Sequence, residues 1–236
     1  MDINFPLFAG IIAAVAHVIA GPDHLAAVTP FAIESKRKAW KVGLYWAIGH
    51  ISGMLFIGLL FLFFKDFIPI ERISKHSELL VGIVLIVLGI WIFVKLFRKE
   101  KVHGHMHVHS DGEPVVHQHK HHHNQGFDHH HEHTKIKRGN LASLYVGFIH
   151  GLAGIAHFVL LLPVLGFENE MASVLYLGGF AVGTLVAMIS FAFLMGRIAA
   201  TVSKEDHHSN LFKGLKLASG LLALIIGVYW VMLNFN

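Results

Sequence analysis

Six long runs of apolar residues follow one another along the chain, and polar or charged stretches separate them. Each run has about 20 residues or more, which is the length that an α-helix needs to cross about 30 Å of hydrocarbon. The pattern therefore predicts an all-α membrane protein with six transmembrane helices. We place them at 5–32, 42–64, 79–97, 141–166, 171–196 and 211–235.

The first apolar run is interrupted by Gly21 and Pro22. Proline lacks a backbone N–H and its ring clashes with the preceding turn, so we expect a broken or sharply kinked helix here. Broken helices line the binding sites of many transporters.

The composition agrees with lipid as the main solvent of the chain. Hydrophobic residues make up 54% of it and charged residues only 14%, against about 45–50% and about 25% in soluble domains. The net charge is +4, but Lys and Arg lie between the apolar runs and form no basic domain, which argues against a nucleic-acid partner. The chain has no Cys, which excludes disulfides, thiolate metal sites and thiol redox relays.

Lys and Arg are distributed unequally between the two ends of the predicted bundle. With six spans, sixteen of the nineteen lie on the side that holds the long central segment 98–140, and only Lys65, Arg72 and Lys75 lie on the other. By the positive-inside rule the first side is cytoplasmic. Both termini then face outward, and the expected location is the cell (inner) membrane.

The two halves of the chain carry the same motif in different predicted helices. At an offset of 133, the segment from His17 to His24 aligns with the segment from His150 to His157, and both halves read H-x-x-A-G-x-x-H-x5-P. Close helix packing alone explains small residues such as those of Gly179-x-x-x-Gly183, but it does not explain repeated histidines.

The repeat has a consequence for the membrane topology. Each half has three spans, an odd number, so the second half enters the membrane from the opposite side. The sequence therefore predicts two inverted three-helix repeats, at 1–97 and 141–236, which bind substrate at their interface near mid-membrane.

Five histidines and one aspartate fall within the predicted spans, where ionisable groups are costly and mark sites or pathways. These residues are His17, Asp23, His24, His50, His150 and His157. His17 lies about twelve residues into its span, which at about 1.5 Å per residue is near the bilayer midplane. A single membrane histidine is often only a packing contact, but repeated pairs favour a site.

The chemistry of imidazole favours a transition metal at this site. Imidazole nitrogen suits Ni, Co, Zn and Cu, whereas Mg and Ca prefer oxygen ligands. Asp23 is either a direct ligand or the acceptor that orients a ligating histidine. We expect no permanently bound cofactor, since the divalent ion (Ni, Co or Zn) is the cargo.

The segment 98–140 is predicted to be a disordered cytoplasmic loop, because its His-rich tract cannot form an apolar core. Metal binding is the physical interpretation of such a composition, and a solvated spacer is the alternative. The accessory ligands are His103, His105, His107, His109, His117, His119, His121, His122, His123, His129, His130, His131 and His133. For His76, His207 and His208, in predicted loops, simple surface exposure is expected.

These motifs resemble the nickel/cobalt transporter superfamily, including its efflux members and its urease-accessory-like relatives. The segment from His17 through Asp23-His24-Leu-Ala-Ala-Val is similar to the first-helix signature, although its spacing is one residue longer than usual. Gly49-His50 resembles the Gly-His block of the second span, and His150-Gly-Leu-Ala-Gly resembles a block of the urease-accessory-like members. The resemblance implies a six-helix transporter with nickel or cobalt as cargo.

The leading hypothesis is thus a secondary transporter of divalent transition metal and not an enzyme. Histidine ligands must be deprotonated to bind metal, which allows coupling to a proton gradient. The expected partners are the lipid bilayer and divalent metal ions, and a homo-oligomer or a cytoplasmic metallochaperone are further candidates.

Three other functions agree less well with the sequence. An exporter of small anions such as sulfite or organosulfur acids is the main alternative, but it would favour Lys or Arg inside the spans. A membrane electron carrier would lack its thiols here. A metal sensor or buffer would not need the repeated midplane histidines.

Overall fold

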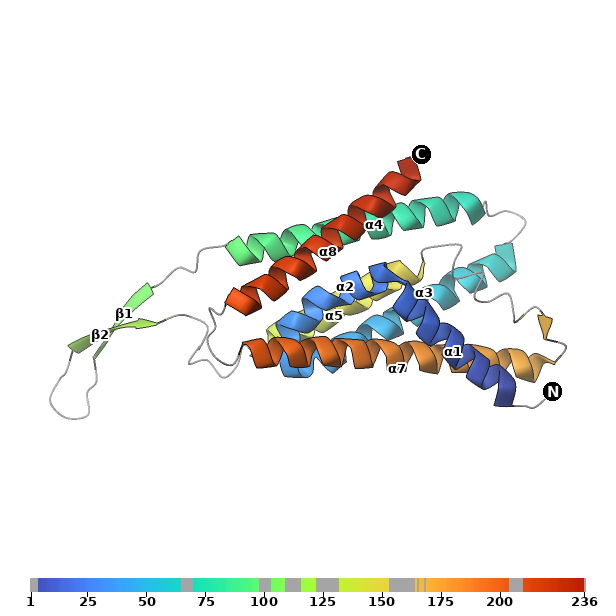
Figure 1. Cartoon of the computed structure of the whole chain (residues 1–236), viewed down its shortest axis with the longest axis horizontal. Helices are drawn as coiled ribbons and strands as arrows, with labels where there is room; N and C mark the ends of the chain where they lie inside the picture. The colour runs from blue at the N-terminus through green and yellow to red at the C-terminus, as the bar shows by residue number, and fades with distance from the viewer. Residues whose placement is uncertain are drawn as a thin grey trace.

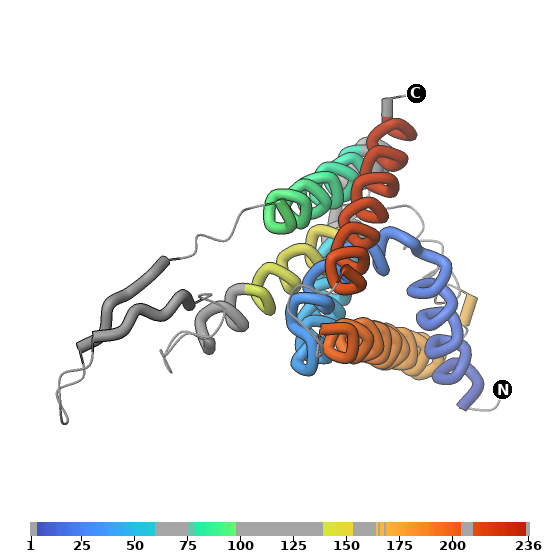
Figure 2. The backbone as a smooth tube through the Cα atoms, turned by 60° about the vertical axis from the view of Figure 1, so that its left-hand side comes forward, coloured from blue at the N-terminus to red at the C-terminus, as the bar shows by residue number. Residues whose placement is uncertain are grey.

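The computed structural model describes residues 4–64, 70–97, 103–108, 116–121, 132–152, 164, 166, 167, 169–203 and 210–235. Its helices lie along one another in one bundle (Figures 1 and 2). The elements are α1 (Asn4–Ala20), α2 (Pro22–Ser35), the 3₁₀ turn η1 (Lys36–Lys38), α3 (Ala39–Phe64), α4 (Ile70–Phe97), β1 (His103–Val108), β2 (Val116–His121), α5 (Glu132–Gly151), α7 (Glu170–Val202) and α8 (Asn210–Phe235).

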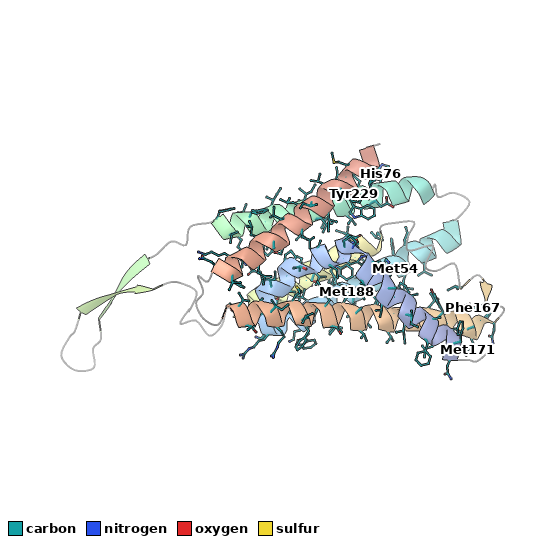
Figure 3. The ribbon with its side chains drawn as sticks, viewed as in Figure 1. Met54, His76, Phe167, Met171, Met188 and Tyr229 are labelled. Atoms are coloured by element: carbon teal, nitrogen blue, oxygen red, sulfur yellow. The ribbon has the colours of Figure 1, made fainter. Side chains whose placement is uncertain are left out.

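The bundle is that of a membrane protein. Among the described residues, four stretches are long and apolar enough to cross a bilayer: Pro22–Leu59, Glu78–Phe97, Glu170–Val202 and Asn210–Asn234. The first takes in α2, η1 and most of α3, and α1 is a shorter apolar helix. Large apolar side chains such as Phe8, Val186 and Tyr229 are exposed, as expected where lipid is the solvent. Figure 3 labels Tyr229 on α8.

The helix boundaries differ from the predicted ones at several ends. Helix α4 begins at Ile70 and not near 79, and α7 continues to Val202 and not to 196. Helix α5 begins at Glu132, inside the segment predicted as a loop. Residues 153–163 of the fourth predicted span lie outside the described residues.

The first predicted span is broken, as expected from its sequence. Helix α1 ends at Ala20, Gly21 has extended backbone angles (φ −90°, ψ 92°), and α2 begins with Pro22. Proline is well tolerated at a first helical position, because the N–H it lacks would have no partner within the helix. The chain changes direction at this point, which Figure 2 shows between α1 and α2.

The backbones of α3 and α5 approach each other at glycines. A Cβ atom added to Gly49 would lie 2.1 Å from the carbonyl oxygen of Leu144, and one added to Gly53 would lie 2.3 Å from that of Phe148. Only hydrogen fits at such distances. Because both residue numbers rise together along the contact, the two helices run parallel.

Two further helix pairs meet in the same way. The contacts are Gly179 with Leu7 and Gly183 with Ile11 between α7 and α1, and Gly82 with Gly227 and Gly89 with Gly220 between α4 and α8. By the order of these contacts, α1 and α7 are parallel and α4 and α8 are antiparallel. Each pair joins one helix from the first half of the chain to one from the second.

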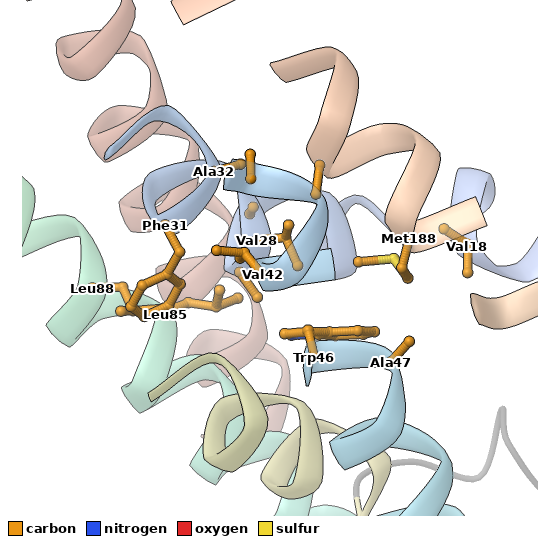
Figure 4. Packing of buried hydrophobic residues seen from close by; sticks show 14 of the residues in the cluster. Val18, Val28, Phe31, Ala32, Val42, Trp46, Ala47, Leu85, Leu88 and Met188 are labelled. Atoms are coloured by element: carbon orange, nitrogen blue, oxygen red, sulfur yellow. The ribbon is translucent and has the colours of Figure 1, made fainter. Parts of the chain in front are cut away.

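Helix α2 lies in the middle of the bundle, in contact with α3, α5, α7 and α8. Val28 and Phe31 of α2 pack with Trp46 of α3, Leu85 of α4 and Met188 of α7 in the apolar core (Figure 4). The polar residues at the start of α2 are therefore carried into the centre of the protein.

Ion pairs hold the far end of α2. Glu34 accepts a hydrogen bond from Lys95 of α4, and its other carboxylate oxygen lies 2.9 Å from the Nζ of Lys216 of α8. One carboxylate thus ties α2 to both members of the α4 and α8 pair.

The segment predicted to be disordered contains a two-stranded antiparallel hairpin. Strands β1 and β2 pair His103 with His121, His105 with His119 and His107 with His117. The alternation of histidine with other residues has the period of a strand, and antiparallel strands satisfy each other's backbone hydrogen bonds. The rest of the predicted loop, at 98–102, 109–115 and 122–131, lies outside the described residues.

Gly49→Ala should destabilise the protein, because its Cβ would meet the backbone of Leu144 and the helices would have to separate. We expect a loss of about 1–3 kcal/mol, measured as a lower melting temperature in detergent. Gly58→Ala on the same helix is the matched control, since nothing lies within 4 Å of the added atom. Alanine normally favours a helix over glycine, so a Gly49→Ala protein as stable as the control would contradict the proposed contact.

Candidate metal centre

Four helices bring histidines and an aspartate together at the centre of the bundle. His17 lies in the last turn of α1, Asp23 and His24 in the first turn of α2, His50 near the middle of α3 and His150 near the end of α5. These side chains come from both halves of the chain. The structure thus gathers all five of the predicted span residues that it describes.

The break at Gly21 shapes this site. The Gly21 N–H donates to the carbonyl of His17, and the His24 N–H donates to the carbonyl of Gly21. The two segments therefore remain joined through the break, and the rings of His17 and His24 lie with centroids 4.5 Å apart. A Cβ atom at Gly21 would lie 2.2 Å from the Nδ1 of His24, so glycine is required here to leave room for the ring.

Asp23 joins the two halves through its carboxylate. Nδ1 of His24 lies 3.1 Å from Oδ1, and Nε2 of His150 lies 2.9 Å from Oδ2. An ionised carboxylate only accepts hydrogen bonds, so each imidazole donates an N–H to it. The second ring nitrogen of each histidine then keeps its lone pair. Asp23 therefore fixes the tautomer of both rings, as the partners of metal-ligating histidines do.

The side chains form two overlapping groups that are compact enough for a metal ion. The first is His17, His24 and His50, and the second is Asp23, His24 and His150. Within each group the ligand atoms lie within 4.8 Å of one another. His24 belongs to both groups, which makes it the central residue of the cluster.

The cluster is largely shielded from the surroundings of the protein. His50 is fully buried, and His24 and His150 are each 2% exposed. A charged or polar group is expensive in such a place unless other polar groups compensate it. The hydrogen bonds of Asp23 with His24 and His150 provide part of this compensation, and a divalent cation would balance the carboxylate.

Sequence reasoning missed Trp46, which lies against three of the histidines. Its ring centroid lies 4.8 Å from that of His50, 5.4 Å from that of His24 and 5.5 Å from that of His150. Trp46 precedes His50 by four residues, which places both on one face of α3. This spacing was the available signal.

Only some of the remaining predicted ligands fall within the described residues. His157 lies outside the described residues, as do His109, His122, His123, His129, His130 and His131. His103, His105, His107, His117, His119 and His121 belong to the hairpin, and His133 to the first turn of α5. His76 is exposed on α4.

Comparison with known proteins places the chain in a family. A family model described as "Cytochrome C biogenesis protein transmembrane region" matches residues 7–229. The chain belongs to this family. The family is named for cytochrome c biogenesis, but a thiol redox step is not open to this member, because it has no cysteine.

The curated relatives agree with the resemblance seen in the motifs. The chain is 29% identical to the urease accessory protein UreH of Bacillus sp. (strain TB-90), over 98% of this chain and 92% of the relative. It is 28% identical to the chloroplast proteins FOR GROWTH AND FERTILITY 1 and 2 of Arabidopsis thaliana, over 96% of this chain. It spans only 58% and 56% of those two proteins. None of these names is that of an enzyme, and no solved structure matches the chain.

Asp23→Asn should weaken metal binding, because an amide cannot accept hydrogen bonds from both His24 and His150. Loss of such an orienting partner typically lowers metal affinity about 10–100-fold. The Co²⁺ affinity is measured by titration, with the quenching of Trp46 fluorescence as the readout. A Trp46→Phe protein gives the background fluorescence of the other tryptophans. Glu170→Gln, an exposed carboxylate on α7, is the control. Equal affinities of the two variants would show that Asp23 does not serve the centre.

Proposed function

We propose that this protein is a secondary transporter that moves divalent transition-metal ions, nickel or cobalt above all, across the membrane through the histidine and aspartate centre. The observation that carries the proposal is the convergence of four imidazoles and one carboxylate from four helices in the buried middle of the bundle. His50 lies near the middle of α3, which supports a position of the centre near the bilayer midplane.

The glycine contacts support an inverted repeat of two three-helix halves. Gly49 meets Leu144, and Gly183 meets Ile11. Leu144 lies 133 positions after Ile11, and Gly183 lies 134 positions after Gly49, so exchanging the halves converts one contact into the other.

The third helix of each half follows the same rule. Gly82 meets Gly227, and Gly89 meets Gly220. Gly220 lies 138 positions after Gly82, and Gly227 lies 138 positions after Gly89. Exchanging the halves therefore converts each of these two contacts into the other. The antiparallel direction of α4 and α8 is what a two-fold axis in the membrane plane requires of equivalent helices.

The ligand chemistry supports a late first-row metal. Imidazole nitrogens outnumber carboxylate oxygens at the centre, which favours nickel, cobalt or zinc over magnesium or calcium. In this proposal the histidines bind the ion in transit, while Asp23 orients two of them and offsets the charge of the ion. His157, at the position equivalent to His24 in the second half, completes the proposed ligand set.

The relatives and the central segment add support. The name of UreH connects that protein to urease, which fits metal handling in a similar chain. We assign the His-rich segment 103–133 to the cytoplasm of a cell whose inner membrane holds the protein, with both termini outside. There it collects metal ions near the entrance or exit of the path.

An anion exporter fits the centre less well. The centre contains a carboxylate that accepts two hydrogen bonds, and such a group repels sulfite or an organosulfur acid. None of the relatives named above supports this alternative.

His24→Ala should reduce metal transport to background, because His24 belongs to both ligand groups. Transport is measured as the nickel and cobalt content of cells with and without the protein, determined by mass spectrometry. His76→Ala, which removes an exposed histidine, is the matched control and should transport normally. Normal transport by a His24→Ala protein would leave the motif with a structural role only.

Removing residues 103–133 should leave the maximal rate of transport largely unchanged. The many interchangeable weak ligands of this segment raise the metal concentration near the protein. Their loss should therefore raise the bulk metal concentration that gives half the maximal rate. A Gly/Ser spacer of equal length separates the loss of histidines from the loss of length. A spacer protein that inserts normally but transports nothing at saturating metal would place the segment in the obligatory path.

A further inference from the structure

An aromatic ring lies against the first histidine of each repeat motif. The ring centroids of Trp46 and His150 are 5.5 Å apart, and those of Phe180 and His17 are 6.1 Å apart. His150 lies 133 positions after His17, and Phe180 lies 134 positions after Trp46. The two contacts are therefore equivalent in the proposed repeat, although neither aromatic residue can ligate a metal.

Trp46 serves the centre by the shape and position of its ring. Its indole stacks on His50 with 15° between the planes and meets His24 at 63°. The side chain is fully buried, and its N–H has no hydrogen-bond partner among the described residues. A buried indole normally satisfies its N–H, so the contact with three imidazoles is kept at a cost. An imidazole that binds a metal ion becomes more positive, which strengthens its attraction to an aromatic face.

Phe180 occupies the corresponding place on the other half. Its ring is tilted by 35° against that of His17, and the side chain is 4% exposed. It packs in one buried cluster with Ala14 and Met54. Ala14 precedes His17 on α1, so this cluster lies on the side of His17 toward the end of the bundle where α7 begins.

Helices α3 and α7 run antiparallel, which decides where the two rings lie. Gly43 of α3 lies against the backbone of Met188 of α7, whereas Met54 of α3 packs with Phe180 of α7. Figure 3 labels both methionines inside the bundle. Residue numbers therefore rise along α3 as they fall along α7.

The aromatic rings consequently lie on opposite sides of the centre. Trp46 precedes His50 by one turn on α3, and Phe180 precedes Thr184 by one turn on α7. Thr184 lies between Phe180 and Met188, so it lies at about the level of His50. Trp46 is on the side where α3 begins, and Phe180 is on the side where α7 begins.

We propose that Trp46 and Phe180 are positioning residues of the metal centre, each of which holds one histidine and closes the centre toward one side of the membrane. The inference rests on the proposed function, because it assigns the two rings to the same path. We call the rings of Trp46 and Phe180 the two walls of the centre, because they lie at equivalent positions on either side of the ligands. The wall at Trp46 faces the end of the bundle that we assign to the cytoplasm.

Labelling of an introduced cysteine tests the walls without any metal. The chain has no cysteine, so Thr184→Cys supplies a single buried reporter at the level of the centre. Membrane vesicles of both orientations are treated with a thiol reagent that cannot cross lipid. Lys38→Cys at the start of α3 and Glu170→Cys at the start of α7 calibrate the two sides, since both positions are exposed.

The reporter should remain unlabelled from one side until the wall on that side is removed. Trp46→Leu should allow the reagent to label the introduced cysteine from the side of Lys38. Phe180→Leu should allow labelling from the side of Glu170. Trp40→Leu on α3 and Phe193→Leu on α7 replace exposed aromatic residues of the same helices and should change nothing. Labelling from both sides alike, or from neither, would overturn the proposal.

A second measurement tests the positioning role. Trp46→Phe retains a ring against His50 and should leave transport near normal, which also guards against a general loss of folding. Trp46→Leu should raise the metal concentration for half-maximal rate about 10-fold or more, as loss of an orienting partner does. Equal behaviour of the two variants would refute the positioning role. If no variant and no native protein transports metal, the proposed function fails, whereas the labelling result still decides whether the walls exist.

Discussion

Polar groups in the hydrocarbon core of a bilayer have no water to bond with, so they must find their partners inside the protein. The carboxylate of Asp23 meets this demand by accepting from His24 and His150. His24 is its neighbour in the chain, whereas His150 belongs to the other half. This shared carboxylate links the two halves at the point where the proposed cargo binds, and removing it would leave two imidazoles without orientation.

Backbone contacts at glycine place these side chains within reach of one another. Gly147 and Gly151 of α5 abut the backbone of Trp46 and His50, so α3 and α5 touch along the stretch that carries His50 and His150. Helices in lipid gain little from apolar burial against each other and depend on such close packing. The same residues that hold the helices together therefore set the distances between the histidines.

Helix α2 connects the centre to the surface of the bundle. Its first turn carries Asp23 and His24, and Glu34 near its last turn is held by Lys95 and Lys216 of the α4 and α8 pair. The break at Gly21 separates α2 from α1. Helix α2 therefore contacts the centre at its first turn and the α4 and α8 pair near its last turn.

Local composition and short motifs in the sequence predict the helical membrane character, the break at Gly21 and the set of candidate ligands. The sequence did not reveal Trp46 as a neighbour of His24 and His150 or Glu34 as a partner of two lysines, since these contacts join residues far apart in the chain. The pairing of β1 with β2 was not predicted either, because it depends on backbone hydrogen bonds between two separate strands. The contact of Asp23 with both His24 and His150 could not be read from the sequence, because it depends on how closely the glycines allow separate helices to approach.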